Sequence, residues 1–252
     1  MKNDKWKIWD NNNKYGETLY KRATGELPEM ESSKALAKII QQKIGSPEKI
    51  LDVGCGAGHY LKSLRNQLKA EFIYTGVDAT KNYIELAKKA FADDREASFF
   101  VSDIYNLEVD DKSNDLVISC NLLLHLPAIV KPINELVRVA KDAVIIRLLC
   151  GERSFRIQDV HPEENGNEFT EDGNPINYYY YNIYSKDYLK NIFSKIERID
   201  SYEIIDDLDY NCENIVNSIE EHQDYNATRL ISGYQVNGYI LQPWAFVILY
   251  LK

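Results

Sequence analysis

Three glycines at every second position join an apolar strand to a helix in the first quarter of the chain. Gly54, Gly56 and Gly58 follow the apolar residues 50–53, and a helical pattern begins directly after them. Glycine adopts left-handed backbone angles at little cost and lets a ligand approach the main chain more closely than a Cβ atom permits. The free amides at the start of the helix are suited to bind a pyrophosphate or the amino-acid part of a nucleoside ligand. The loop therefore predicts a nucleotide-type site, with the acidic Asp52 beside it.

Acidic and polar residues follow each of the next three predicted strands. Asp78 ends the second strand, Asp103 follows the third, and Asn121 and His125 follow the fourth. The carboxyl ends of parallel strands share one edge of a sheet, and ligands bind there where the winding reverses. The two oxygens of the Asp78 carboxylate can accept hydrogen bonds from a pair of hydroxyls. His125 has two interpretations: a general base that points into the site, or a structural residue that closes the start of the next helix.

Apolar periodicity predicts the strands and helices that position these residues. The expected strands cover residues 49–53, 72–77, 97–101, 115–120, 143–150, 195–205 and 244–251. The expected helices carry apolar residues on one face and cover residues 31–44, 58–69, 81–91, 128–140, 185–193 and 212–222. The first five strands are almost wholly apolar, and their alternation with helices is typical of a parallel sheet covered on both faces. Right-handed crossovers then give a doubly wound α/β fold.

Two segments show no regular period. Residues 1–30 carry aromatic side chains among polar ones, which favours either a surface arm clamped by its aromatics or a flap over the site that presents Tyr15, Tyr20 and Arg22. Residues 151–184 are rich in Asn, Glu and Gly and contain a run of four tyrosines near their end. A loop of this length inside a compact domain is usually functional or disordered. We therefore expect the second segment to be an insertion that forms a lid.

Composition limits the classes of partner. The chain has 252 residues, a formal net charge of −9 and a pI near 5.1, so its charge opposes the phosphate backbone of a nucleic acid. No apolar run approaches the ~18 residues that a membrane span requires. The polar N-terminal residues do not resemble a secretory signal. We expect a single domain in the cytoplasm, monomeric or homodimeric, that binds neither nucleic acid nor membrane.

The cysteines predict no disulfide and no metal site. Cys55, Cys120, Cys150 and Cys212 lie far apart and lack the Cys-x-x-Cys spacing of zinc or redox sites. We expect reduced, mostly buried thiols. Cys55, inside the glycine loop, is the one with a chance of greater exposure.

The register of the glycines separates two kinds of nucleoside site. A dinucleotide fingerprint requires Gly-x-Gly-x-x-Gly, and His59 stands where its third glycine belongs. Residues 52–58 and the acidic Asp78 instead resemble motif I and its partner in the class I S-adenosylmethionine-dependent methyltransferases. Residues 101–104 and 115–126 look like the next two motifs of that family, in the same order and spacing.

The resemblance implies a fold and a division of the chain. It covers residues 48–150 well and the last strands loosely, and it implies a Rossmann-like methyltransferase fold with a mostly parallel, seven-stranded sheet. The single domain then consists of an N-terminal arm and cap helix (1–47), a cofactor-binding core (48–150), the lid insertion (151–184) and the C-terminal part of the sheet (185–252).

The resemblance also implies the cofactor, S-adenosyl-L-methionine, and the roles of the residues around it. Asp78 would accept from both ribose hydroxyls, and Asp103 from the adenine amine, while the Ile104 amide donates to the ring. Asn121 would reach the methionine amino group, and Arg22 the methionine carboxylate. The full set of expected cofactor contacts is Tyr15, Arg22, Asp52, Gly54, Gly56, Gly58, Asp78, Ala79, Asp103, Ile104 and Asn121.

The implied reaction needs little acid or base chemistry. Methyl transfer from a sulfonium is an in-line displacement, so the enzyme aligns the acceptor and removes its proton where that proton is still present. The candidate catalytic residues are His125, His161 and Tyr178. The first hypothesis is O-methylation of a hydroxyl on a small polar molecule, such as a sugar, a nucleotide-linked intermediate or an envelope-polysaccharide precursor. The alternatives are N-methylation of a small amine and a non-catalytic module that binds S-adenosylmethionine.

No metal is expected at the site. A positive sulfur needs no metal for its activation. A metal-dependent O-methyltransferase would use a cluster such as Asp159, His161, Glu163 and Glu164, but no second cluster follows at a strand end.

Overall fold

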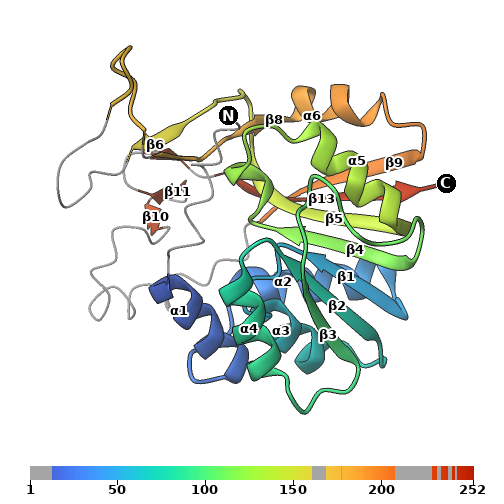
Figure 1. Cartoon of the computed structure of the whole chain (residues 1–252). Helices are drawn as coiled ribbons and strands as arrows, with labels where there is room; N and C mark the ends of the chain where they lie inside the picture. Colours follow the sequence, from blue (N-terminus) through green and yellow to red (C-terminus); the bar gives the residue numbers. More distant parts are fainter. Residues whose placement is uncertain are drawn as a thin grey trace.

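A mixed sheet of eight strands forms the centre of the protein (Figure 1). The computed structural model describes residues 13–160, 169–176, 178–207, 229–231, 234–237, 240–241 and 243–252. The strands of the sheet are β1 (Lys49–Val53), β2 (Ile73–Asp78), β3 (Ala97–Val101), β4 (Asn114–Cys120), β5 (Ala140–Gly151), β8 (Tyr184–Ser185), β9 (Ile199–Asp206) and β13 (Trp244–Leu251). Seven of them follow the order β3-β2-β1-β4-β5-β13-β9, and the short β8 pairs with β5 as the eighth.

The strand directions create one edge where functional residues can gather. Strands β1 to β5 pair in parallel, and β13 runs antiparallel to both β5 and β9. The chain leaves β1 on one side for β2 and β3 and then returns to the other side for β4 and β5, so the winding reverses between β1 and β4. The expected doubly wound sheet is confirmed, with β8 as an addition to the seven expected strands.

Helices cover both faces of the sheet (Figure 1). Successive strand residues point to opposite faces, and Ile50 and Leu51 accordingly belong to two different buried clusters. The helices on the Ile50 face are α2 (Glu31–Ile39) with its π-helical extension η2 (Ile40–Ile44), α3 (His59–Gln67) and α4 (Lys81–Ala90). Those on the Leu51 face are α5 (Val130–Val139) and α6 (Lys186–Phe193). These elements confirm the helices expected between residues 31 and 193, whereas the expected helix 212–222 lies outside the described residues.

The N-terminal segment contains a helix that the sequence did not predict. Helix α1 (Asn13–Thr24) packs against α3 and α4. Its buried stripe consists of Gly16, Leu19 and Ala23, so only one residue of the three is strongly apolar. A Cβ atom at Gly16 would lie 2.7 Å from the Tyr83 ring, which explains why a glycine stands within this helix. The absence of large apolar residues hid the helical period.

The insertion after β5 folds onto the loop that follows β4. Strand β6 (Gln158–Val160) pairs antiparallel with β7 (Tyr178–Tyr180). The Asn182 amide nitrogens join this segment to the loop, because the backbone N–H donates to the Leu124 carbonyl at 2.9 Å and the side chain donates to the Leu126 carbonyl at 2.9 Å. The expected lid is therefore attached directly beside His125.

Several segments gather at the carboxyl edge of the parallel strands. Figure 1 shows α1, β6 and the strands β10 (Arg229–Ile231) and β11 (Tyr234–Asn237) on the left, where β1 and β4 end. With β12 (Ile240–Leu241), the last two form a small antiparallel sheet. Among the described helices, none combines the length and the apolar character needed to cross a membrane.

Candidate functional site

The glycine loop turns tightly between β1 and α3. Gly54, Gly56 and Gly58 have φ angles of 82°, 55° and 80°, which favour glycine over every other residue. The amides of Gly54 and Cys55 both donate to the Val77 carbonyl on β2, at 2.7 and 3.0 Å. A Cβ atom at Gly56 would lie 2.8 Å from Leu19 of α1. The loop is therefore fixed to β2 on one side and contacted by α1 on the other.

Asp78 holds the glycine loop from the end of β2. Its Oδ2 accepts a hydrogen bond from the Gly56 amide at 2.9 Å, and its Oδ1 accepts from the Thr80 amide at 2.8 Å. A carboxylate oxygen has two lone pairs and can accept more than one hydrogen bond. The structure thus fixes the orientation of this carboxylate at the point where β1 and β2 end together.

The end of β3 adds polar groups next to Asp78. The Ser102 amide donates to the Asp78 carbonyl at 3.0 Å, and Asp103 Oδ1 accepts from the Tyr105 amide at 3.0 Å. The Ser102 Oγ is buried and makes no hydrogen bond. The Ile104 amide likewise donates to no group within the described ranges. Ala79 lies exposed between these residues and α4.

Asn121 is held by a buried arginine that sequence analysis did not identify. Asn121 has a φ of 60°, in the left-handed region, and its Oδ1 accepts from Arg147 Nη1 at 2.6 Å. Arg147 is only 2% exposed and pairs with Asp207 through Nε and Nη2, at 2.7 and 2.6 Å from one carboxylate oxygen. Its guanidinium also lies 4.1 Å from the centre of the Trp244 ring. The signal in the sequence is a single arginine within the otherwise apolar run of β5.

Asp52 lies below the loop in the interior. It is 2% exposed, and the Tyr74 hydroxyl donates to its Oδ2 at 2.6 Å. Burial raises the pKa of Asp52 from 3.8 to about 7, although the hydrogen bond from Tyr74 acts in the opposite direction. Because the folded-state pKa lies above the ordinary value, this group makes the free energy of unfolding fall as pH rises from 3.8 to about 7.

Helix α1 brings Tyr15 close to Asp78. Burial of the hydroxyl raises the pKa of Tyr15, and the nearby charges of Arg22 and Asp78 act on it with opposite signs. The residue as a whole is 42% exposed. Tyr20 lies elsewhere, with the Lys89 ammonium 5.1 Å from its ring centre.

Arg22 of the same helix is partly buried near the glycine loop. Its Nη1 donates to the Pro28 carbonyl at 2.7 Å, and burial lowers its pKa. Its charge is close enough to His59 to contribute, after burial, to the lowered pKa of that residue. Arg22 therefore lies near the start of α3, and one of its donors is used within the chain.

His125 is hydrogen-bonded to the tyrosine-rich segment, and burial keeps its imidazole neutral. It ends the 3-10 helix η3 (Leu123–His125), and its Nδ1 lies 2.9 Å from the Tyr180 carbonyl oxygen. A carbonyl only accepts, so Nδ1 carries the proton and Nε2 is an acceptor. Burial lowers the pKa of His125 to about 4. The Tyr181 and Tyr179 rings lie 5.5 and 6.2 Å away, centre to centre.

Of the other two candidate catalytic residues, the structure describes Tyr178 but not His161. Tyr178 lies in β7, with its ring edge-on to Tyr180 at 5.6 Å, and a hydrogen bond with Tyr180 raises its pKa. A raised pKa makes Tyr178 a donor at neutral pH. His161 lies outside the described residues, as do Glu163 and Glu164.

The structure also shows the surroundings of Asp159, a possible metal ligand, and the burial of three of the cysteines. Asp159 is the described member of the metal cluster considered above, and its Oδ2 accepts from the Tyr179 hydroxyl at 2.6 Å. Among the residues that the structure describes, no three His, Cys, Asp or Glu residues are grouped as metal ligands. Cys55, Cys120 and Cys150 are buried free thiols, as expected, and Cys212 lies outside the described part. The greater exposure considered for Cys55 is wrong, because the residue is 1% exposed and burial raises its pKa well above the usual value.

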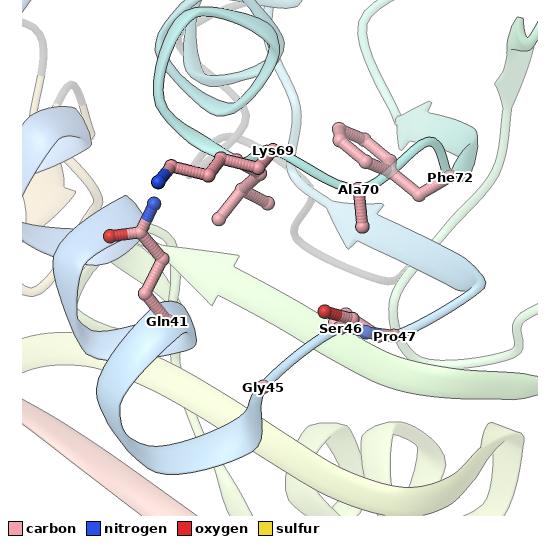
Figure 2. A pocket seen from close by; sticks show the side chains of 8 residues that line it. Gln41, Gly45, Ser46, Pro47, Lys69, Ala70 and Phe72 are labelled. Carbon is pink, nitrogen blue, oxygen red and sulfur yellow. The ribbon is translucent and has the colours of Figure 1, made fainter.

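A cavity of about 290 Å³ lies at the amino-terminal ends of the parallel strands, the edge of the sheet opposite to the glycine loop (Figure 2). It is formed by the loops that lead into β1 and β2, and its lining residues are Gln41, Gly45, Ser46, Pro47, Leu68, Lys69, Ala70 and Phe72. The polar groups of the glycine loop and of the strand ends are all at the carboxyl edge. Chemistry therefore favours the carboxyl edge as the functional site over this cavity.

A family model described as a methyltransferase domain matches residues 50–143, which include the glycine loop, Asp78, Asp103 and Asn121. Residues 50–143 therefore match a methyltransferase domain. Ajmaline N-methyltransferase of Rauvolfia serpentina is 31% identical over 125 residues, which cover 47% of this chain and 40% of that protein. The chain therefore matches less than half the length of this curated relative.

Solved structures of methyltransferases share the fold over nearly the whole chain. A Thermotoga maritima protein described as a possible histamine N-methyltransferase has a TM-score of 0.56 and 13% identity, with 98% of this chain and 100% of that chain covered. Magnesium protoporphyrin IX methyltransferase of Synechocystis, solved with S-adenosylmethionine, has a TM-score of 0.57 and 13% identity, with 99% and 98% covered. At these identities the likeness establishes the methyltransferase fold.

The polar groups at the carboxyl edge fit the cofactor of this methyltransferase family. Two buried atoms without a hydrogen-bond partner, Ser102 Oγ and His59 Nδ1, lie at the ends of β3 and of the glycine loop. Natural proteins rarely leave buried polar atoms unpaired. A ligand with hydroxyl, amine and carboxylate groups would supply partners to both.

Proposed function

We propose that this protein binds S-adenosylmethionine at the carboxyl edge of β1 to β4 and transfers its methyl group to a small polar molecule. The observation that carries the proposal is the Asp78 carboxylate, which accepts from the Gly56 and Thr80 amides and is thereby fixed beside the glycine loop, where a carboxylate can bind ribose hydroxyls. The neighbouring strand end presents Asp103 and the Ile104 amide to an adenine. Hydroxyls and an adenine edge are the groups that an adenosine offers.

The remaining expected contacts fit the methionine portion. The glycine loop and Asn121 lie at adjoining strand ends, and Arg22 brings a positive charge from α1. Asp52 lies beneath them and is poised to ionise near neutral pH beside a positively charged ligand. The proposed cofactor contacts are Tyr15, Arg22, Asp52, Gly54, Gly56, Gly58, Asp78, Ala79, Asp103, Ile104 and Asn121.

A small amine is the acceptor that the site favours. A histidine with a pKa of about 4 is a weak proton acceptor at neutral pH, and an efficient general base has a pKa near the working pH. The neutral His125 can instead orient an N–H group through Nε2. An amine brings its own lone pair to the methyl carbon, the sulfur keeps the electrons of the broken S–C bond, and the surplus N–H proton passes to water. Two of the relatives, ajmaline N-methyltransferase and the possible histamine N-methyltransferase, carry names that denote nitrogen acceptors.

A hydroxyl acceptor is the second candidate. In that case His125 Nε2 would take the hydroxyl proton, because Nδ1 donates to the Tyr180 carbonyl. Tyr178 would then act as a donor that positions the acceptor, because its pKa is raised. The role of His161 as a base stays a prediction on a residue outside the described part of the chain.

The proposal is tested by methyl transfer from S-adenosylmethionine labelled in its methyl group. The acceptors are matched small amines and alcohols, and binding of the cofactor is measured by calorimetry on the same sample. We expect cofactor binding and label transfer to amines in preference to alcohols. Binding without transfer to any acceptor would support the non-catalytic module instead, and a protein that does not bind the cofactor would contradict the proposal altogether.

Replacing His125 by alanine is expected to lower kcat by about 100-fold, because the acceptor loses the group that orients it or takes its proton. The cofactor dissociation constant is expected to change little. The pH profile of wild-type kcat should show no step near pH 6.5 from this histidine, because its pKa is about 4. Initial rates with saturating cofactor measure the effect.

The His125→Asn variant separates catalysis from attachment of the lid. An asparagine amide can still donate to the Tyr180 carbonyl but has no counterpart of Nε2. We expect this variant to be as slow as the alanine variant. Near-wild-type turnover of His125→Asn would return His125 to a structural role.

A further inference from the structure

His59 is the first residue of α3 and directly follows the last glycine of the loop. Its Nδ1 is completely buried and has no hydrogen-bond partner. The ring stands edge-on to the Tyr60 ring, with the centres 4.9 Å apart. An unpaired buried polar atom lowers the stability of the folded protein. A residue with this cost at a ligand-binding loop points to a partner that the ligand supplies.

The surroundings of His59 show where that partner would lie. A Cβ atom on Gly56 would be 3.7 Å from both Nδ1 and Cε1 of the ring, so the imidazole borders the glycine loop directly. The same Cβ would lie 2.8 Å from the side chain of Leu19, so helix α1 also borders the glycine loop at Gly56. Arg22, one turn further along α1, is near enough for its charge to act on the imidazole.

The charge at this position favours an anionic partner. Burial, with Arg22 as the second cause, lowers the pKa of His59 to about 3, so the ring is neutral at pH 7. A neutral imidazole can carry its proton on Nδ1 and donate it. A donor beside an arginine suits a carboxylate, because a carboxylate only accepts and is stabilised by the positive charge.

We infer that His59 binds the carboxylate of the methionine portion of the cofactor, by donating from Nδ1 with Arg22 beside it. This inference rests on the proposed function. It makes His59 a specificity residue, since a ligand with the adenosine part alone would gain nothing from it. The residue that departs from the dinucleotide fingerprint thus has a role of its own in the site.

Two ligands and two variants test this role. S-adenosylhomocysteine carries the amino-acid part, and 5′-methylthioadenosine carries the same adenosine thioether without it. Calorimetry is expected to show that His59→Ala weakens S-adenosylhomocysteine binding by about 10-fold, the scale of one hydrogen bond to a charged group. Binding of 5′-methylthioadenosine should be unchanged. His59→Asn, whose amide can donate from nearly the same place as Nδ1, should restore most of the lost affinity.

Thermal unfolding of the ligand-free variants separates a loss of ligand affinity from a loss of protein stability. Because His59→Ala deletes an unpaired buried nitrogen, its midpoint without ligand should not fall much, while the shift produced by S-adenosylhomocysteine should shrink. Equal weakening of both ligands would show that His59 merely shapes the loop, and no weakening would also overturn the inference. A wild-type protein that fails to bind S-adenosylhomocysteine would instead contradict the proposed function.

Discussion

Replacing Arg147 by methionine is expected to lower the free energy of unfolding by about 3–5 kcal/mol, because the change leaves the charge of Asp207 buried without its partner. Asp207 is 5% exposed and accepts two of its hydrogen bonds from this guanidinium, at 2.6 and 2.7 Å. Methionine keeps an unbranched side chain against Trp244, so the loss of charge is the main change. Urea unfolding followed by circular dichroism measures the effect.

Adding a substitution of Asp207 tests whether the unpaired charge causes the loss of stability in Arg147→Met. In Arg147→Met with Asp207→Asn neither of the two positions carries a charge, and we expect recovery of a large part of the lost stability. Lys141→Met is the matched control, since its ion pair with Asp115 lies at the surface and should change stability little. If Arg147→Met is as stable as wild type, the pair does not hold the carboxyl edge together.

The same arginine holds a residue of the proposed cofactor site. Arg147 Nη1 donates to Asn121 Oδ1 at 2.6 Å, and the Asn121 amide donates to the Arg147 carbonyl at 2.9 Å. A left-handed φ at a residue other than glycine persists when its surroundings enforce it. Loss of Arg147 should therefore also weaken cofactor binding, through the orientation of Asn121.

Replacing Asp78 by alanine is expected to raise the dissociation constant of S-adenosylmethionine by about 10- to 100-fold, the scale of two lost hydrogen bonds to ribose hydroxyls. The upper end is expected, because the Gly56 and Thr80 amides also lose the acceptor that orients them. Calorimetry on the folded variant measures the change.

An exposed aspartate near α4 is the control for this experiment. Asp93→Ala removes the same charge from the surface and should leave the dissociation constant as it is in wild type. Unchanged affinity in Asp78→Ala would contradict the assignment of this carboxylate to the ribose. A loss of affinity in both variants would indicate a general charge effect.

Most of the fold could be predicted because its signals are local. Apolar runs predicted the strands β1 to β5, and apolar residues on one face predicted the helices between them. The structure confirms these strands and helices and their order along the chain. Helix α1 was missed because Gly16 and Ala23 bury a face without a strong apolar signal. The short β8 was missed because two residues are too few to show a period.

The sequence by itself determined where the proposed site lies on the sheet. The spacing of three glycines and an acidic residue at the next two strand ends is a local pattern, and parallel strands bring their carboxyl ends to one edge whatever the packing around them. Only the tertiary structure decided the partners and the charge states. Arg147 pairs with Asp207 across 60 residues, and His125 meets the Tyr180 carbonyl across 55. Such contacts and the burial that makes His59 and His125 neutral depend on packing between distant segments, which no local pattern encodes.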